Sequence, residues 1–466
     1  MGIRFISKRA GKKFLKGACL LAGLWILFMA ALTCTAMIPR NAIRPALESN
    51  ARYYSSADVF EIISGGWDGA MVHNYADAML YNLIWSVDTS RPFTSVMTAP
   101  RYRGGKEESW DSPAKGLEAM VFQGREPDTS YGRYWHGTSV LLRPLSMVMD
   151  IHGIRILNAL VLGGLAVVFG LLLWRRKLCA PLAGYVLAMV MCKTYAVPLC
   201  IEYVPCFVIM LAFGSILLLF YEKVRDWDLW FLASGAAVCF FDFLTCEILT
   251  LFVPLICLLY LRYKGQKGCR RACIYDIIRI SLIWLAGYGL TFLCKWLVVS
   301  WITGQSLDNV ALHMGMRRLA GNFYAQAPPG VSGTAGVTKP VTGWQGLDAV
   351  LVNLGRVWPM NLAPTAVYIG RTSAILVLVL ITAWFLFRKK EGDKGLALPL
   401  LLIAFMPILR WMVVSNHSLG HPFFTFRDWF IIFMAVAGVL GESLDWSIFR
   451  PAAHAGGGDG KGEGSA

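Results

Sequence analysis

The sequence has little charge for its length. Asp, Glu, Lys and Arg make up 16% of its 466 residues, whereas 56% of the residues are hydrophobic. A soluble chain is roughly a quarter charged, so this composition excludes a soluble globular protein. The charges that are present are 44 basic and 29 acidic, which gives a net charge of +15. No basic stripe falls on a soluble domain, and this excludes a nucleic-acid-binding surface.

Cysteine is missing from the two long polar segments of the chain. All twelve cysteines lie in or beside apolar stretches or short basic loops, and residues 39–153 and 301–371 contain none. This excludes a disulfide framework in those segments. Cys269 and Cys273 share a basic loop that lacks a second Cys pair or a His pair, so no zinc site is predicted there. The chain also lacks an internal repeat, which argues against a carrier built from inverted repeats.

The sequence is instead rich in apolar stretches close to the roughly 20 residues that cross a bilayer. The fifth and sixth are short and are interrupted around Cys246 and Glu247, which indicates broken or tilted helices. We predict an all-α, polytopic membrane protein of about ten transmembrane helices with a large structured extracytoplasmic loop after the first helix. The ten stretches are Phe14–Met37, Ile154–Trp174, Leu178–Val197, Tyr203–Tyr221, Leu229–Thr245, Leu249–Leu261, Ile277–Ser300, Thr372–Phe387, Leu396–Val414 and Phe430–Leu440.

Lys and Arg cluster at every second junction between these stretches, which predicts that those junctions and both termini are cytoplasmic. The first stretch exceeds the 7–15 apolar residues of a signal peptide, so we expect it to be retained. The predicted organisation is a basic cytoplasmic N-terminus (1–13), a first transmembrane helix (14–38), an extracytoplasmic loop with interfacial helices (39–153), transmembrane helices 2–7 (154–300), a second extracytoplasmic loop (301–371), transmembrane helices 8–10 (372–448) and a disordered cytoplasmic tail (449–466).

The first outer loop is expected to be partly ordered. Val59–Ile63 and Ala76–Ile84 have apolar residues at helical spacing, and such amphipathic helices can lie at a lipid interface. Thr89–Asp128 is polar and interrupted by Pro and Gly, which predicts a loop. A further interfacial helix is predicted over Val140–Met149.

Ionisable residues at the outer ends of apolar stretches are the candidates for function. Asp68 and Asp77 are predicted to be catalytic, because moving a sugar onto a hydroxyl needs a carboxylate that accepts the proton. Substrate and phosphate binding is expected from Arg forks, imidazoles and aromatic faces. Two distant clusters should therefore meet at one outward-facing cavity, with Arg133 and Arg427 pointing into it. The predicted binding residues are Arg133, Tyr134, Trp135, His136, Asp242, His417, His421 and Arg427, and the wider outer set adds His73, Arg143, Glu247 and Lys295.

This layout resembles the GT-C superfamily of polyprenyl-phosphate-sugar-dependent glycosyltransferases, which includes protein O-mannosyltransferases and lipid A aminoarabinose transferases. The resemblance implies a multi-pass enzyme of the cell membrane, with its active site on the extracytoplasmic face. It also implies a polyprenyl-phosphate-linked sugar as donor and a glycan, lipid or protein as acceptor. The adjacent acidic pair of the mannosyltransferases is absent, which leaves the base open. The motifs that carry the resemblance are Trp67-Asp68, Asn74–Asp77, Tyr131–His136, Phe241–Thr245 and Asn416–Ser418 with His421 and Phe424–Arg427.

Other interpretations stay open. A transporter or flippase of lipid-linked saccharides is the main alternative, and a ligase or polymerase of lipid-linked glycans is a third. Asp68 fits a turn or helix cap, Asp77 the wet face of its helix, Arg133 a side chain that reaches toward lipid headgroups, and His136 a structural hydrogen-bonding group. No spacing specifies a metal site, so no metal ligand is predicted, although a divalent cation remains open as a cofactor.

Overall fold

The computed structural model describes residues 2–64, 70–104, 112–312, 387–388 and 395–445. It is about 75% helical with almost no sheet, which confirms the all-α class. Four helices of the described part are long and apolar enough to cross a membrane: Gly11–Ala36, Ile151–Arg175, Arg270–Thr303 and Pro422–Ser443. Five further apolar helices are shorter. The predicted stretch Thr372–Phe387 lies, apart from Phe387, outside the described residues.

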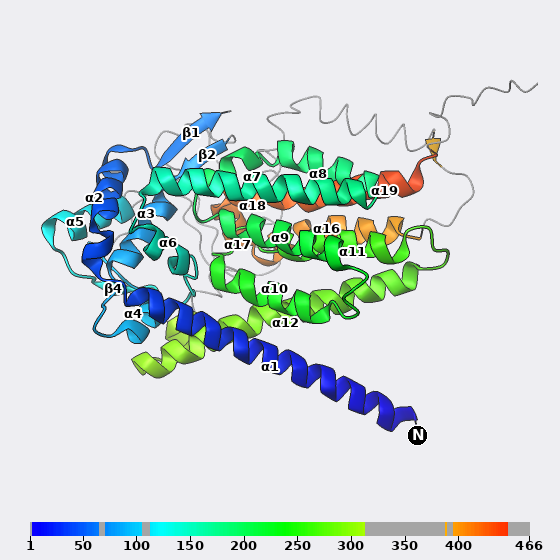
Figure 1. Cartoon of the computed structure of the whole chain (residues 1–466), viewed down its shortest axis with the longest axis horizontal. Helices are drawn as coiled ribbons and strands as arrows, with labels where there is room; N and C mark the ends of the chain where they lie inside the picture. Colours follow the sequence, from blue (N-terminus) through cyan, green and yellow to red (C-terminus); the bar gives the residue numbers. More distant parts are fainter. Residues whose placement is uncertain (1, 65–69, 105–111, 313–386, 389–394, 446–466) are drawn as a thin grey trace, which may run out of the picture.

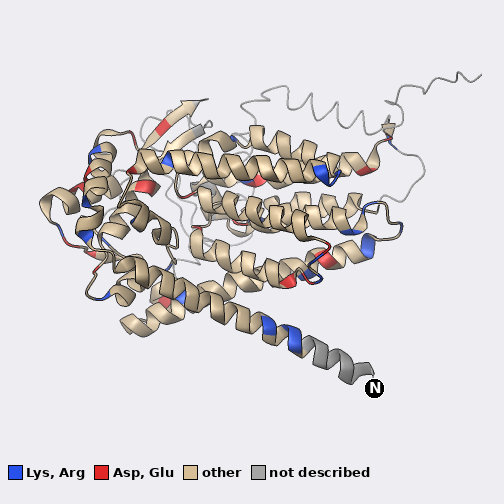
Figure 2. Ribbon diagram, viewed as in Figure 1, with Lys and Arg blue, Asp and Glu red and all other residues tan. Residues whose placement is uncertain are grey.

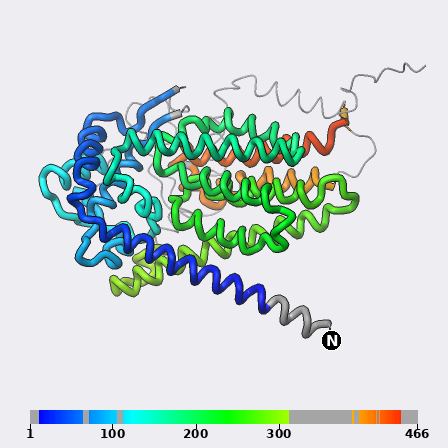
Figure 3. Tube along the Cα trace, in the orientation of Figure 1, coloured from blue at the N-terminus to red at the C-terminus, as the bar shows by residue number. Residues whose placement is uncertain are grey.

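The helix bundle follows the predicted apolar stretches closely (Figure 1, Figure 3). The chain leaves the helical conformation between α10 and α11, where the sequence predicted an interruption. Helices α10 and α12 approach so closely that a Cβ on Gly235 would lie 2.2 Å from the Trp284 carbonyl oxygen, so only glycine fits there. The elements are α1 (Gly2–Ala36), α7 (Ile151–Arg175), α8 (Cys179–Met191), η1 (Thr194–Leu199), α9 (Val204–Phe220), α10 (Asp228–Phe241), α11 (Leu249–Tyr263), α12 (Arg270–Thr303), η2 (Asp308–Leu312), α16 (Ala397–Val413), α17 (Ser415–Gly420), α18 (Pro422–Thr425), η3 (Phe426–Asp428) and α19 (Trp429–Ser443).

Most of the segment between α1 and α7 folds into one packed outer unit at an end of the bundle (Figure 1). It comprises α2 (Arg40–Ser56), β1 (Phe60–Ser64), β2 (Ala70–His73), α3 (Asn74–Trp85), α4 (Pro92–Thr98), β3 (Pro100–Arg101), α5 (Ser112–Gln123), β4 (Thr129–Ser130) and α6 (Ser139–Leu145). The helices predicted at Ala76–Ile84 and at Val140–Met149 correspond to α3 and α6. Strands β1 and β2 form an antiparallel hairpin, and β3 pairs with β4.

Two expectations about this outer unit were wrong. Val59–Ile63 was expected to be helical, but most of it lies in strand β1, because five residues are too few to separate helical from strand periodicity. The polar segment Thr89–Asp128 was expected to be a loop, but it contains α4 and α5. Pro92 and Pro113, which had been interpreted as helix breakers, lie in the first turns of these helices, where proline is favoured.

Basic residues of the described junctions lie together at the opposite end of the bundle from the outer unit. Lys264 donates a hydrogen bond from Nζ to the Lys177 carbonyl oxygen at 3.1 Å, and Arg176 pairs with Glu222. Figure 2 shows most charged residues toward the two ends of the bundle and few along its middle. Which side of the membrane each end faces stays a prediction.

Two buried basic side chains, Arg143 and Lys295, connect parts of the outer unit to one another and to the bundle. Lys295 of α12 donates from Nζ to the Met97 carbonyl oxygen at 2.8 Å, and Arg143 of α6 donates to the carbonyl oxygens of Ile84 and Ile38. Both side chains are buried. Hydrogen bonds from a charged donor contribute roughly 1.5–3 kcal/mol each. Lys295 and Arg143 are therefore structural anchors of the outer unit.

Candidate functional site

A cavity of about 90 Å³ lies where the outer unit meets the bundle. Its wall combines two histidines of the segment 415–428, which we call the last outer segment, with a third histidine and three tyrosines of the outer unit. One carboxylate that precedes α9 completes it. The lining residues are His73, Tyr75, Ala76, Met79, Leu80, Leu83, Tyr131, Tyr134, Glu202, Phe243, His417, His421 and Phe424. Segments more than 340 residues apart in the sequence thus line one cavity, whereas Arg133, His136 and Arg427, which were expected at a common cavity, are not among its lining residues.

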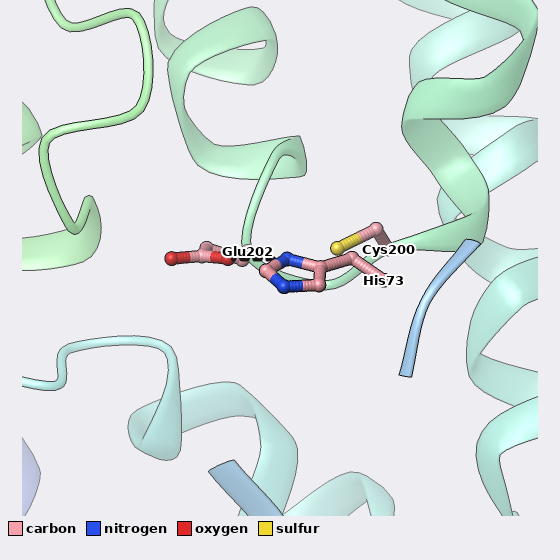
Figure 4. A group of neighbouring side chains, drawn as sticks. All are labelled: His73, Cys200 and Glu202. Carbon is pink, nitrogen blue, oxygen red and sulfur yellow. Dashed lines mark hydrogen bonds and ion pairs between the residues drawn. The ribbon is translucent and has the colours of Figure 1, made fainter. Parts of the chain in front are cut away.

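His73, Cys200 and Glu202 form a compact buried cluster on this wall, the His–Cys–Glu cluster (Figure 4). One potential ligand atom from each side chain lies within 4.8 Å of the others. His73 Nδ1 is 3.2 Å from Glu202 Oε2. Imidazole nitrogen, thiolate sulfur and carboxylate oxygen are the three ligand types that zinc takes in proteins. Among the described residues, this cluster has ligand atoms of suitable type and spacing to hold a metal ion.

The β-hairpin holds His73 in place. His73 ends β2, directly opposite Phe60 of β1, and the two rings stack with their centroids 5.0 Å apart. Phe423 contacts the same imidazole edge-on at 5.0 Å. Because the ring is enclosed by aromatic neighbours, its orientation toward Glu202 is well defined.

Asp77 fixes the backbone between Cys200 and Glu202, the other two residues of the cluster. Its side chain accepts a hydrogen bond from the backbone amide of Ile201 at 2.9 Å, between the two cluster residues Cys200 and Glu202. Arg155 of α7 approaches the same carboxylate at 3.5 Å. Asp77 is fully buried and is not among the described cavity-lining residues. The interpretation of Asp77 as the wet face of its helix is therefore wrong.

The buried position of Asp77 changes its acidity. Burial raises the pKa of Asp77 to about 6, against the opposing effects of Arg155 and of the Ile201 amide. Arg155 also donates to Asn74 Oδ1 and to the Tyr53 hydroxyl, both at 2.9 Å. The Asp77–Arg155 contact thus joins α3 and α7 to the turn that carries Glu202.

The last outer segment contributes two stacked imidazoles to the cavity. The rings of His417 and His421 lie 4.6 Å apart. His417 Nε2 donates to the Leu244 carbonyl oxygen at 2.6 Å, and His421 Nδ1 donates to the His417 carbonyl oxygen at 3.1 Å. These bonds connect the segment to the turn after α10, so both rings are positioned by backbone contacts.

That turn is itself built on buried carboxylates. Asp242 accepts from the Thr245 amide at 2.9 Å and from the Thr245 hydroxyl at 2.5 Å. Arg410 of α16 contacts both carboxylate oxygens of Glu247, at 3.1 and 3.0 Å. Asp242 and Glu247 therefore shape the turn that supports His417.

The segment Arg133–His136 lies mainly beside the cavity. The Arg133 guanidinium lies over the rings of Tyr131 and Tyr134, at 4.2 and 5.3 Å. Trp135 is fully buried and donates from Nε1 to the Thr291 carbonyl oxygen at 2.9 Å. His136 donates from Nε2 to the Tyr131 carbonyl oxygen at 2.8 Å, and burial lowers its pKa to about 3. His136 is therefore neutral near pH 7 and brings no positive charge for a phosphate.

Arg427 is also buried beside the cavity. It lies over the Tyr203 ring at 4.6 Å and donates to the Phe423 carbonyl oxygen at 3.2 Å. The structure thus brings Tyr134, His417 and His421 to the cavity wall. Asp68 lies outside the described residues. The other predicted site residues, all described and all outside the cavity lining, are Asp77, Arg133, Trp135, His136, Asp242 and Arg427.

The sequence reasoning missed Cys200 and Glu202 as site residues. The available signal was a carboxylate between the predicted third and fourth apolar stretches, on their outer side, shortly after Pro198. An ionisable residue in that position is a default functional candidate in a membrane protein.

Comparisons of the chain with protein-family models, with curated proteins and with solved structures found no match. The functional argument therefore depends on the site itself.

Proposed function

We propose that this protein is an integral-membrane glycosyltransferase that moves a sugar from a polyprenyl-phosphate donor to a hydroxyl acceptor at the extracytoplasmic face. One observation carries the proposal: a single cavity, at the end of the bundle away from the basic junctions, combines a carboxylate, three imidazoles and several aromatic rings. Phenol rings offer flat faces and hydroxyl groups to a sugar, and ionisable side chains this well buried are typical of functional sites.

The proposed reaction forms one bond and breaks another. The acceptor oxygen bonds to the anomeric carbon of the sugar, and the bond from that carbon to the phosphate oxygen breaks, so that polyprenyl phosphate leaves. The hydroxyl proton goes to the His73–Glu202 pair, whose atoms lie 3.2 Å apart. A carboxylate held beside an imidazole is suited to general-base catalysis.

The leaving phosphate gains negative charge as the bond breaks. His417 and His421 line the same cavity. Each ring already donates one N–H to a backbone carbonyl oxygen, so a hydrogen bond to the phosphate would use the second ring nitrogen in its protonated form, and such preorganised donors stabilise charge that develops in the transition state. We therefore assign the phosphate to this pair, and not to Arg133 or Arg427.

The size of the cavity sets a requirement for donor binding. At about 90 Å³ it is smaller than most ligand sites, which usually measure about 300–1,000 Å³. We therefore infer that the cavity takes only the reacting groups of the substrates.

The test is a donor assay on the purified full chain in vesicles, with a panel of polyprenyl-phosphate sugars and release of polyprenyl phosphate as the readout. Glu202→Gln should lower the rate by about 10² or more, the usual effect of losing a general base. Glu222→Gln is the matched control, since Glu222 pairs with Arg176 at the other end of the bundle, and its rate should be unchanged. A folded wild-type protein that neither binds nor consumes any donor of the panel would overturn the proposal.

A further inference from the structure

We propose that the His–Cys–Glu cluster is a zinc site with three protein ligands and an open coordination position toward the cavity. His73 is supplied by the outer unit, whereas Cys200 and Glu202 are supplied by the turn between η1 and α9. Ion binding would therefore connect the outer unit to the bundle at the point where the cavity forms.

The geometry is close to that of a zinc site. Zinc bonds of about 2.0–2.3 Å in a tetrahedron place neighbouring ligand atoms roughly 3.3–3.8 Å apart. His73 Nδ1 and Glu202 Oε2 are already 3.2 Å apart, and the three ligand atoms lie within 4.8 Å of one another. A side-chain movement of about 1 Å completes the set. Figure 4 shows the His73 imidazole beside the Cys200 sulfur, with a dashed line from its nitrogen to the Glu202 carboxylate.

Charge favours a divalent ion at this position. Zinc binds cysteine as the thiolate and displaces the thiol proton, so that with the Glu202 carboxylate and a neutral imidazole the zinc complex would carry no net charge. His73, Cys200 and Glu202 are 3%, 0% and 8% exposed, and burying an uncompensated charge is expensive. The thiolate and imidazole favour zinc over magnesium or calcium, which prefer oxygen ligands.

Neighbouring groups hold the ligands in position. The Asp77 carboxylate accepts from the Ile201 amide, which lies between the two ligands of the turn, and the Phe60 ring stacks on His73. Contacts of this kind orient metal ligands and increase affinity. His73 and Glu202 line the cavity, so the fourth position of the ion faces it.

Zinc at this site would also act in the proposed glycosyl transfer. Only this role of the ion depends on the proposed function. A hydroxyl bound to zinc has a lowered pKa and loses its proton more readily near neutral pH. In that case the zinc-bound acceptor hydroxyl would pass its proton to the Glu202 carboxylate oxygen that does not bind the ion, and His73 would act as a ligand only. Metal binding itself does not depend on glycosyl transfer.

The test measures metal content directly. The full chain is purified under reducing conditions, stripped with a chelator, reloaded with Zn²⁺ alone and analysed by mass spectrometry of the metal. About one zinc per chain is expected in the wild type, and less than roughly a tenth of that zinc content in Cys200→Ser. Cys257→Ser is the matched control, because Cys257 is a buried thiol in α11, and it should bind zinc like the wild type.

Cobalt provides a second readout that does not depend on activity. Co²⁺ bound through a thiolate gives a ligand-to-metal charge-transfer band, which Cys200→Ser should lose and Cys257→Ser should keep. Equal zinc content in the wild type and in Cys200→Ser would overturn the metal site. Zinc binding without donor turnover would instead retain the metal site and reject glycosyl transfer, so the two proposals fail separately.

Discussion

Two hollows of the described part, toward opposite ends of the helix bundle, differ in size and in lining. The cavity beside His73 measures about 90 Å³ and has polar and aromatic walls. A groove between the N-terminal half of α1 and helices α10 and α12 measures about 810 Å³ and is mainly apolar, with Lys13 and Asp226 at its margin. Size alone would select the groove as the functional site, whereas the chemistry of the walls selects the cavity.

The two regions also differ in how their charges are held. The Lys13–Asp226 pair at the groove has side chains that are 52% and 39% exposed, whereas those of the Arg410–Glu247 pair near the cavity are 7% exposed each. Exposed pairs contribute roughly 0–1 kcal/mol, and buried charges are costly unless paired. The buried pair near the cavity is therefore expected to matter more for stability than the exposed pair at the groove.

The largest effect on stability is expected at Arg410. Arg410→Met leaves Glu247 and Asp428 buried without their cation, and breaking a buried pair in this way costs about 3–5 kcal/mol. The same substitution at Arg176, whose partner Glu222 is 61% exposed, should cost less than about 1 kcal/mol. Thermal unfolding in one detergent measures both. Equal losses for the two variants would remove the distinction between the two ends.

A smaller effect with a distinctive pH dependence is expected at Asp77. An unfolded aspartate titrates near pH 4, whereas burial raises the pKa of Asp77 to about 6 in the folded protein. Between these values the folded state binds more protons, so stability falls as pH rises from about 4 to 6. Two pKa units correspond to roughly 3 kcal/mol.

Asp77→Asn removes this titration. The stability of the wild type relative to Asp77→Asn should therefore decrease from pH 4 to 6 and then level off, as followed by thermal unfolding at constant ionic strength. Asp88→Asn is the control, because Asp88 is exposed and hydrogen bonds from Ser90 lower its pKa. A difference between wild type and Asp77→Asn that stays constant over this range would contradict the buried position of Asp77.

The two regions were not equally predictable from the sequence. The helices of the bundle were predicted because long apolar runs leave few alternatives in a membrane protein, and the break at Glu247 was visible as a charge within such a run. The outer unit was predicted less well. Its short strand β1 has too few residues to reveal its period, and Pro113 begins a helix that its presence had argued against.

The candidate site was predicted in part for a related reason. His417, His421 and Tyr134 were identified because they belong to local clusters of polar and aromatic residues, and all three line the cavity. The bond from the Ile201 amide to Asp77 joins residues 124 positions apart, and no local pattern announces it. Glu202 has no other charged residue close to it in the sequence, so only its contact with His73 in the folded protein identifies it as a site residue.

The smallest effect is expected at the groove. Lys13 Nζ lies 2.7 Å from Asp226 Oδ2, yet both side chains are largely exposed, so water and salt screen the attraction. The screening length falls from about 10 Å at 0.1 M to about 3 Å at 1 M ionic strength. Lys13→Gln should therefore lower stability by less than about 1 kcal/mol at low salt and leave it unchanged at 1 M. The same salt series should hardly alter the loss caused by Arg410→Met, because that pair is out of reach of mobile ions. If the stability loss caused by Lys13→Gln did not change with salt, the groove would be closed around this pair in the membrane. The contrast between the two ends would then lie in the chemistry of their walls alone.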